Sequence, residues 1–134
     1  MRRIEGGTRK GNSARGRAAH SLGLRAETLA AFWLRLKGYH ILERRLKTRA
    51  GEIDMVARRG RTLVIVEVKA SARNGMAGER AVEALLPRQQ QRLVRAADHL
   101  LAMRPVLAGL DIRFDLVLVA PRRLPRHLVD AWRP

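Results

Sequence analysis

Two short segments place carboxylates and an amine where they could act together. Glu52 and Asp54 alternate along residues 52–57, and Glu67 and Lys69 alternate along residues 62–69. Clean alternation in the first segment and β-branched residues in the second are typical of strands. A glycine-containing tetrapeptide separates them, so the sequence predicts an antiparallel hairpin with a tight turn.

The hairpin geometry determines which of these side chains can meet. A two-residue turn at Arg59 and Gly60 would set Asp54 opposite Ile65. Because side chains alternate between the faces of a strand, Glu52, Asp54, Glu67 and Lys69 would then share one face. Asp54 and Glu67 would be diagonal neighbours, roughly 7–8 Å apart at the backbone.

Two explanations are open for this charged strand face. It could be a solvated surface with an ion pair, which is the ordinary reading of a Glu-x-Lys fragment. Alternatively, Asp54 and Glu67 could supply oxygen ligands to Mg²⁺ or Mn²⁺. Lys69 would then orient or deprotonate a water, or stabilise charge developing at a phosphate.

The net charge points to a polyanionic partner. The chain has 28 Lys and Arg residues against 12 acidic residues, a formal charge of +16. Only four of the 28 are Lys, a ratio to which a GC-rich genome would contribute. Residues 1–20 hold six basic residues and one acidic residue, so the remainder is basic by itself. Nucleic acid and an anionic membrane surface are the two candidate partners.

Composition excludes several classes of protein. The 134 residues suit one domain, and the absence of Cys excludes disulfides, Cys-based zinc sites, iron–sulfur clusters and a cysteine nucleophile. The longest apolar run, residues 29–34, is far too short to span a membrane. No apolar segment follows the basic N-terminus, so we expect no signal peptide and a cytoplasmic protein.

Apolar spacing predicts the other elements. Residues 22–37 are expected to form a helix, and residues 39–46 a weak strand. The apolar stripe expected on this helix is Leu22, Ala26, Leu29, Ala30 and Trp33. A second helix should run from Pro87 to about Met103, and residues 112–119 should form another strand.

This order predicts an α/β domain, α-β-β-β-α-β, with a mixed sheet flanked by helices. We expect a flexible basic arm over residues 1–20, which could equally be a solubilising leader. The domain would cover residues 21–122, and residues 123–134 would be a C-terminal tail. The four His residues show no metal-ligand spacing and are expected at the surface, whereas Asp115 is expected to pair with a basic residue.

The acidic motifs also resemble a known group of proteins. Gly51-Glu52-Ile53-Asp54 followed by Val66-Glu67-Val68-Lys69 resembles the PD-(D/E)XK nuclease superfamily. The resemblance is closer to the bacterial YraN-type family, whose restriction-endonuclease-like core is similar to archaeal Holliday junction resolvases. It covers about residues 21–120 and includes further matching runs: Gly23 to Glu27, Gly38-Tyr39, Gln91-Arg92-Leu93 and Arg113-Phe114-Asp115.

The resemblance implies roles for individual residues. Asp54 and Glu67 match the metal-binding acids, and Lys69 matches the superfamily lysine. Glu27 matches an acid that adds a ligand or positions water, although the sequence alone favours a plain surface glutamate. The family usually has Lys where this chain has Gln89, and often Arg where it has Ser71.

Two functions remain open at this point. The first is a Mg²⁺- or Mn²⁺-dependent endonuclease acting on DNA, including branched or damaged DNA. The second is a catalytically weak or inactive nucleic-acid-binding module that works with a DNA-processing partner. In either case the candidate nucleic-acid contacts are Arg58, Arg73, Arg88, Gln89 and Arg92. A membrane partner would leave the acidic face unexplained, and similarity to dimeric resolvases implies a homodimer.

Overall fold

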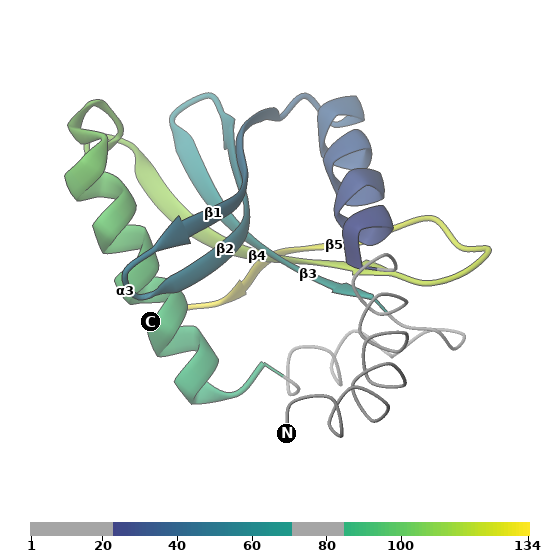
Figure 1. The fold of residues 1–134 in the computed structure, drawn as a ribbon. Coiled ribbons are helices and arrows are strands. Elements are labelled where there is room, and N and C mark those ends of the chain that lie inside the picture. Colours follow the sequence, from purple (N-terminus) through teal and green to yellow (C-terminus); the bar gives the residue numbers. More distant parts are fainter. Residues whose placement is uncertain (1–22, 71–84) are drawn as a thin grey trace, which may run out of the picture.

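The protein is built on a five-stranded sheet with helices packed against it (Figure 1). The structure, a computed structural model, describes residues 23–70 and 85–134. Residues 23–36 are helical, and α3 (Pro87–Met103) lies against the other face of the sheet. The strand order is sequential: β1 (His40–Thr48), β2 (Gly51–Arg59), β3 (Thr62–Ala70), β4 (Asp111–Val119) and β5 (Arg126–Trp132).

The sheet is mixed, as the sequence predicts. β3 pairs with β2 in antiparallel fashion and with β4 in parallel, and β1 and β5 form the two edges. Residues 63–67 of β3 are all buried because both faces of this central strand are covered. The α-β-β-β-α-β order of a restriction-endonuclease-like core is therefore confirmed for this chain.

The two helices bury different kinds of surface. α3 buries Leu93, Ala96, Ala97 and Leu100 and has the bounds that the sequence predicts. The helix over residues 23–36 instead buries Ala26, Ala30, Ala31 and Leu34, while Leu29 is 49% exposed. Ala26 and Ala30 of the predicted stripe are therefore confirmed as buried, whereas Leu29 is exposed and Trp33 is only partly buried. The surface that this helix buries is mostly alanine, and the larger side chains of Leu24, Leu29, Phe32 and Leu36 face outward.

The hairpin between β2 and β3 differs from the expected one. Arg59 pairs with Thr62, so the turn residues are Gly60 and Arg61 rather than Arg59 and Gly60. Gly60 has φ +60°, which glycine adopts without strain. The register moves by an even number of residues, so the predicted alternation of side chains is retained over the paired residues 55–59 and 62–66. It ends at Asp54, because Ile53 packs in the core cluster on the α3 side whereas Met55 packs in the cluster on the other face.

The C-terminal segment is more than a tail. Residues 123–134 include β5, which pairs with β4 and stacks Trp132 on Phe114 with ring centroids 4.2 Å apart. Neighbouring prolines and a register shift opposite residues 114–116 interrupt the strand pattern, which is why the sequence did not reveal it. The expected basic arm and the loop after residue 70 lie outside the described residues.

Within residues 23–70 and 85–134, no helix is both long enough and apolar enough to cross a membrane.

Candidate functional site

The candidate site lies where β2 and β3 part. Their ladder ends at the pair Met55–Val66, one residue before Asp54 and Glu67. Beyond that point the main-chain N–H of Val68 donates to Asp54 Oδ2 at 2.9 Å. A side-chain carboxylate therefore takes the place of the missing strand acceptor, and Asp54 is held in a fixed orientation by the backbone.

Glu67 is a buried carboxyl group that lies beside the carboxyl group of Asp54. It is 7% exposed, and Lys69 Nζ lies 3.4 Å from its Oε2 atom. Burial raises the pKa of Glu67 to about 7, and the charge and hydrogen bonding of Asp54 act in the same direction. Lys69 opposes this shift without cancelling it. At pH values below about 7 the two acids therefore form a pair that retains a proton unless a cation replaces it.

Glu27 adds a third carboxylate from the helix over residues 23–36. The residue is 8% exposed, and its Oε1 atom is buried without a hydrogen-bond partner among the described residues. Burial and then the charge of Asp54 raise the pKa of Glu27. Its burial contradicts the plain surface glutamate that the sequence alone favoured. An unsatisfied buried acceptor is costly, and a bound cation would satisfy it.

Arg45 is a site residue that the sequence did not reveal. Its guanidinium lies 3.9 Å from Glu27 Oε1 and 3.7 Å from Glu52 Oε1, too far for hydrogen bonds to either. Arg45 has φ +53°, an uncommon conformation for a non-glycine residue, and β1 carries a register shift between Ile41 and Glu43. Neither irregularity has a sequence signal, so nothing distinguished this arginine from its neighbours.

The donor set fits a hard divalent cation. Asp54 and Glu67 are adjacent, Glu27 interacts electrostatically with Asp54, and all the available donors are carboxylate oxygens. In the part of the chain that the structure describes, no three acidic or histidine side chains are already gathered at metal-ligand positions. The buried, unsatisfied Glu27 Oε1 nevertheless supplies an acceptor of the kind that Mg²⁺ or Mn²⁺ would use.

Arg92, one of the expected nucleic-acid contacts, makes a structural contact. Its Nη1 atom donates to the carbonyl oxygen of Glu52 at 2.9 Å, and its side chain lies against Gly51. A Cβ atom at Gly51, which has φ +135°, would lie only 2.7 Å from Arg92 Nη1. Arg92 therefore anchors the start of β2 to α3.

The other predicted contacts are dispersed. Gln89 Oε1 accepts the main-chain N–H of Leu86 at 3.3 Å, so this amide caps the start of α3. Arg58 donates to a carbonyl of its own hairpin turn, at the end of β2 away from Asp54. Arg88 is exposed near the start of α3, and Arg73 lies outside the described residues.

A second polar cluster fastens β5 to β4. Asp115 is fully buried and accepts hydrogen bonds from Arg113, from His127 Nε2 and from the N–H of Asp130. Burial disfavours its charge, but these donors outweigh burial and lower the pKa of Asp115. The predicted pairing of Asp115 with a basic residue is confirmed. The expectation of a surface His127 was wrong, because its side chain is 1% exposed.

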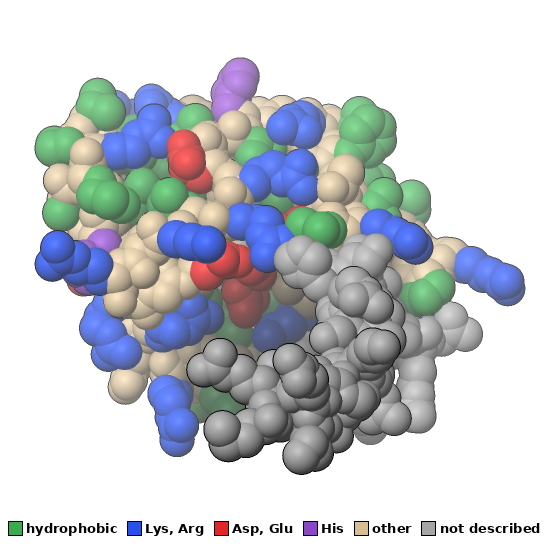
Figure 2. Space-filling view, in the orientation of Figure 1, with side chains coloured by type: hydrophobic (Ala, Val, Ile, Leu, Met, Phe, Trp, Pro, Cys, Tyr) green, Lys and Arg blue, Asp and Glu red, His purple; other side chains and the backbone are tan. Residues whose placement is uncertain are grey.

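The surface around the site is basic. In the space-filling view, carboxylates gather in a hollow near the middle of one face, and Lys and Arg side chains surround them (Figure 2). The fold and this arrangement define an α/β protein with a restriction-endonuclease-like core and a carboxylate–lysine cluster at the end of its central strand. That description gives a class of protein but not a family.

Comparison with known proteins supplies the family. Residues 26–119 match the model of the uncharacterised protein family UPF0102, and the chain belongs to this family. A UPF0102 protein of Parvibaculum lavamentivorans is 66% identical over 126 residues, covering 94% of this chain and 92% of that protein. One from Paramagnetospirillum magneticum is 55% identical over 120 residues, covering 87% and 90%. The family expected from the sequence motifs is thereby confirmed.

Proposed function

We propose that the protein is a divalent-metal-dependent phosphodiester hydrolase that acts on DNA. The observation that carries this proposal is the adjacent pair Asp54 and Glu67, with Lys69 Nζ 3.4 Å from Glu67, at the point where two strands part. Carboxylates and an amine so placed can assist water attack on a phosphate. The net charge of +16 supports a polyanionic substrate.

Each residue has a role in this proposal. Asp54, Glu67 and Glu27 would hold Mg²⁺ or Mn²⁺, which would supply a more acidic water and neutralise phosphate charge. The N–H of Val68 keeps Asp54 oriented. Lys69 Nζ would accept or deliver a proton at the attacking water.

Arg45 would act on the substrate rather than on the water. Its guanidinium lies near Glu27 and Glu52 without a hydrogen bond to either carboxylate. Its N–H groups could therefore donate to a phosphate oxygen.

The test is cleavage of linear, nicked, flapped and four-way DNA with Mg²⁺ or Mn²⁺. Asp54→Asn is expected to abolish cleavage, and Lys69→Met to lower kcat about 10²- to 10⁴-fold. Asp98→Asn, an exposed carboxylate on α3, is the matched control and is expected to retain activity. Equal cleavage by wild type and Asp54→Asn would refute the proposal.

One observation favours a second function, a nucleic-acid-binding module without cleavage. Gln89, which stands where the family usually has Lys, is engaged in capping α3 and is not directed at the acids. If the wild type binds these substrates in Ca²⁺ yet cuts none with Mg²⁺ or Mn²⁺, this second function replaces the first. Asp54→Asn would then bind as tightly as the wild type.

A further inference from the structure

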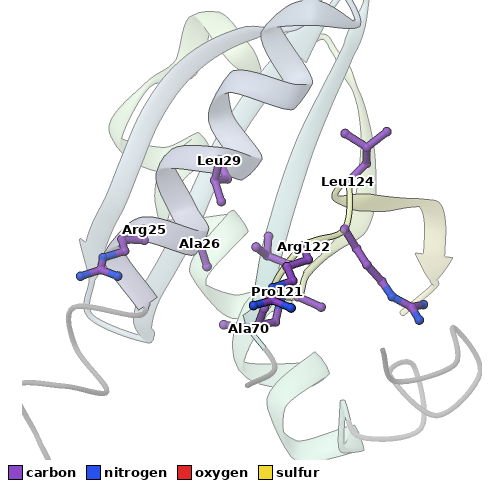
Figure 3. Close-up of a pocket in the computed structure, with 10 residues that line it drawn as sticks. Arg25, Ala26, Leu29, Ala70, Pro121, Arg122 and Leu124 are labelled. Atoms are coloured by element: carbon purple, nitrogen blue, oxygen red, sulfur yellow. The ribbon is translucent and has the colours of Figure 1, made fainter. Parts of the chain in front are cut away.

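A second hollow lies near the carboxylate site, the name we use for Glu27, Asp54 and Glu67 together. It has a volume of about 540 Å³ and is bounded by the helix over residues 23–36, the end of β3 and the turn that follows β4 (Figure 3). Apolar side chains contribute most of its wall, among them Leu29, Pro121 and Leu124. Leu29 is 49% exposed and Leu124 is 72% exposed, so this apolar surface faces solvent.

Three arginines border the same hollow. Arg25 comes from the helix over residues 23–36, and Arg122 and Arg123 come from the turn after β4. Arg122 has φ +60°, a conformation in which an arginine is strained and a glycine is not. We call this hollow the arginine groove. Guanidinium planes on which a base can stack, beside an aliphatic wall, suit a ligand that has flat apolar faces and regularly spaced anions.

The arginine groove adjoins the carboxylate site through consecutive residues. Ala26 lines the groove and Glu27 belongs to the site, and Ala70 lines the groove directly after Lys69. The groove and the site are therefore one residue apart on both segments, although successive side chains on a strand point to opposite faces, so a chain leaving the groove would have to pass around the end of β3 to reach the carboxylates.

We propose that the arginine groove binds an unpaired strand of nucleic acid and leads it to the carboxylate site. The inference extends the proposed function, because it specifies a substrate with a single-stranded portion next to the reacting phosphate. In a duplex the base faces are stacked inside and cannot reach an apolar wall, whereas an unpaired strand can use the wall and the arginines together. The basic segment over residues 1–20 has the same charge sign as the groove, which disfavours it as the occupant.

The variant that tests the groove is Arg122→Gly/Arg123→Gln in the full chain. Glycine suits the left-handed backbone at position 122, so this variant is expected to fold. The matched control is Arg61→Gln/Arg95→Gln, which removes the same two charges from exposed positions on the β2–β3 turn and on α3. Circular dichroism and thermal unfolding verify that both variants retain the fold.

The measurement is fluorescence anisotropy with a twelve-nucleotide oligothymidylate and a blunt duplex, in Ca²⁺. The groove variant is expected to bind the single strand about tenfold more weakly, with a salt slope lower by about 1.4 for two lost phosphate contacts. The control variant is expected to change that affinity less than about twofold. Equal losses in the two variants, or an equal loss on duplex and single strand, would overturn the inference, as would competition by polyglutamate as strong as that by the oligonucleotide.

A small substrate separates this inference from the proposed function. Hydrolysis of bis(p-nitrophenyl) phosphate with Mn²⁺ needs the carboxylate site but not the groove, so the groove variant should retain it while Asp54→Asn loses it. If the wild type hydrolyses neither this ester nor DNA, the proposed function fails. The comparison of single-strand binding between the two arginine variants then still decides the inference about the groove.

Discussion

The carboxyl group of Glu67 holds a proton in the folded chain at pH values where the unfolded chain has lost it. Its folded pKa is about 7, against an ordinary value of 4.5. The resulting stabilisation is fully present below the lower value and is lost as pH rises through the higher one. Stability without metal should therefore fall by on the order of 2–3 kcal/mol across this window.

Urea unfolding at a series of pH values measures this effect. Glu67→Gln carries no titratable proton, so its free energy of unfolding should lose this pH dependence and exceed that of the wild type at pH values above the Glu67 pKa. Asp98→Asn, an exposed carboxylate, serves as the control and should follow the wild type. Parallel pH profiles for the wild type and Glu67→Gln would contradict the assignment of a raised pKa to this group.

A divalent ion should compete with the same proton. Because ligands must be deprotonated, Mn²⁺ is expected to raise the Tm of the wild type more at pH 8 than at pH 5.5. Thermal unfolding with and without Mn²⁺ measures the shift, which should shrink in Glu27→Gln and in Asp54→Asn. A shift of the same size at both pH values and in all variants would indicate nonspecific binding of the ion.

At the scale of elements, Asp115 is the residue that attaches β5. Asp115→Ala is expected to cost about 3–5 kcal/mol, because it leaves the buried His127 side chain and the half-buried Arg113 without their shared acceptor. Urea denaturation measures the loss, and hydrogen exchange should quicken first in residues 126–132. Asp111 is an exposed acid at the start of β4, the strand that contains Asp115, and Asp111→Asn should change stability little. If Asp115→Ala speeds hydrogen exchange equally in all five strands, Asp115 does not stabilise β5 in particular.

Regular elements could be predicted because their signals are local. Pro87 and the spacing of Leu93, Ala97 and Leu100 define α3, and alternation along β2 and β3 places Asp54 and Glu67 on neighbouring strands. The error in the turn did not change the parity of the paired residues, but local alternation could not reveal the break at Asp54.

Features that depend on distant contacts could not be predicted. The burial of Glu27 depends on how its helix crosses the sheet, and the position of Arg45 depends on an irregular edge strand. β5 depends on a partner strand and a buried Asp115 that no local pattern reveals.

At the scale of the whole molecule, charge is the dominant property. With +16 distributed over 134 residues, binding of any DNA should weaken steeply with salt. For six or more phosphate contacts, the affinity for a duplex should fall about 10³-fold or more between 50 and 200 mM KCl. Anisotropy titrations at several salt concentrations measure the slope. A flat salt dependence would mean that the basic surface is not the binding surface.

The parallel pairing of β3 with β4 has a consequence for biosynthesis. Every acid of the carboxylate site precedes residue 71, yet β3 obtains its second neighbour only when β4, at Asp111–Val119, has left the ribosome. A parallel neighbour requires a long crossover, so this contact forms late. A nascent chain that ends before residue 111 has its acids but lacks the central sheet that orients them. Translation must be nearly complete before the enzyme we propose could cut anything.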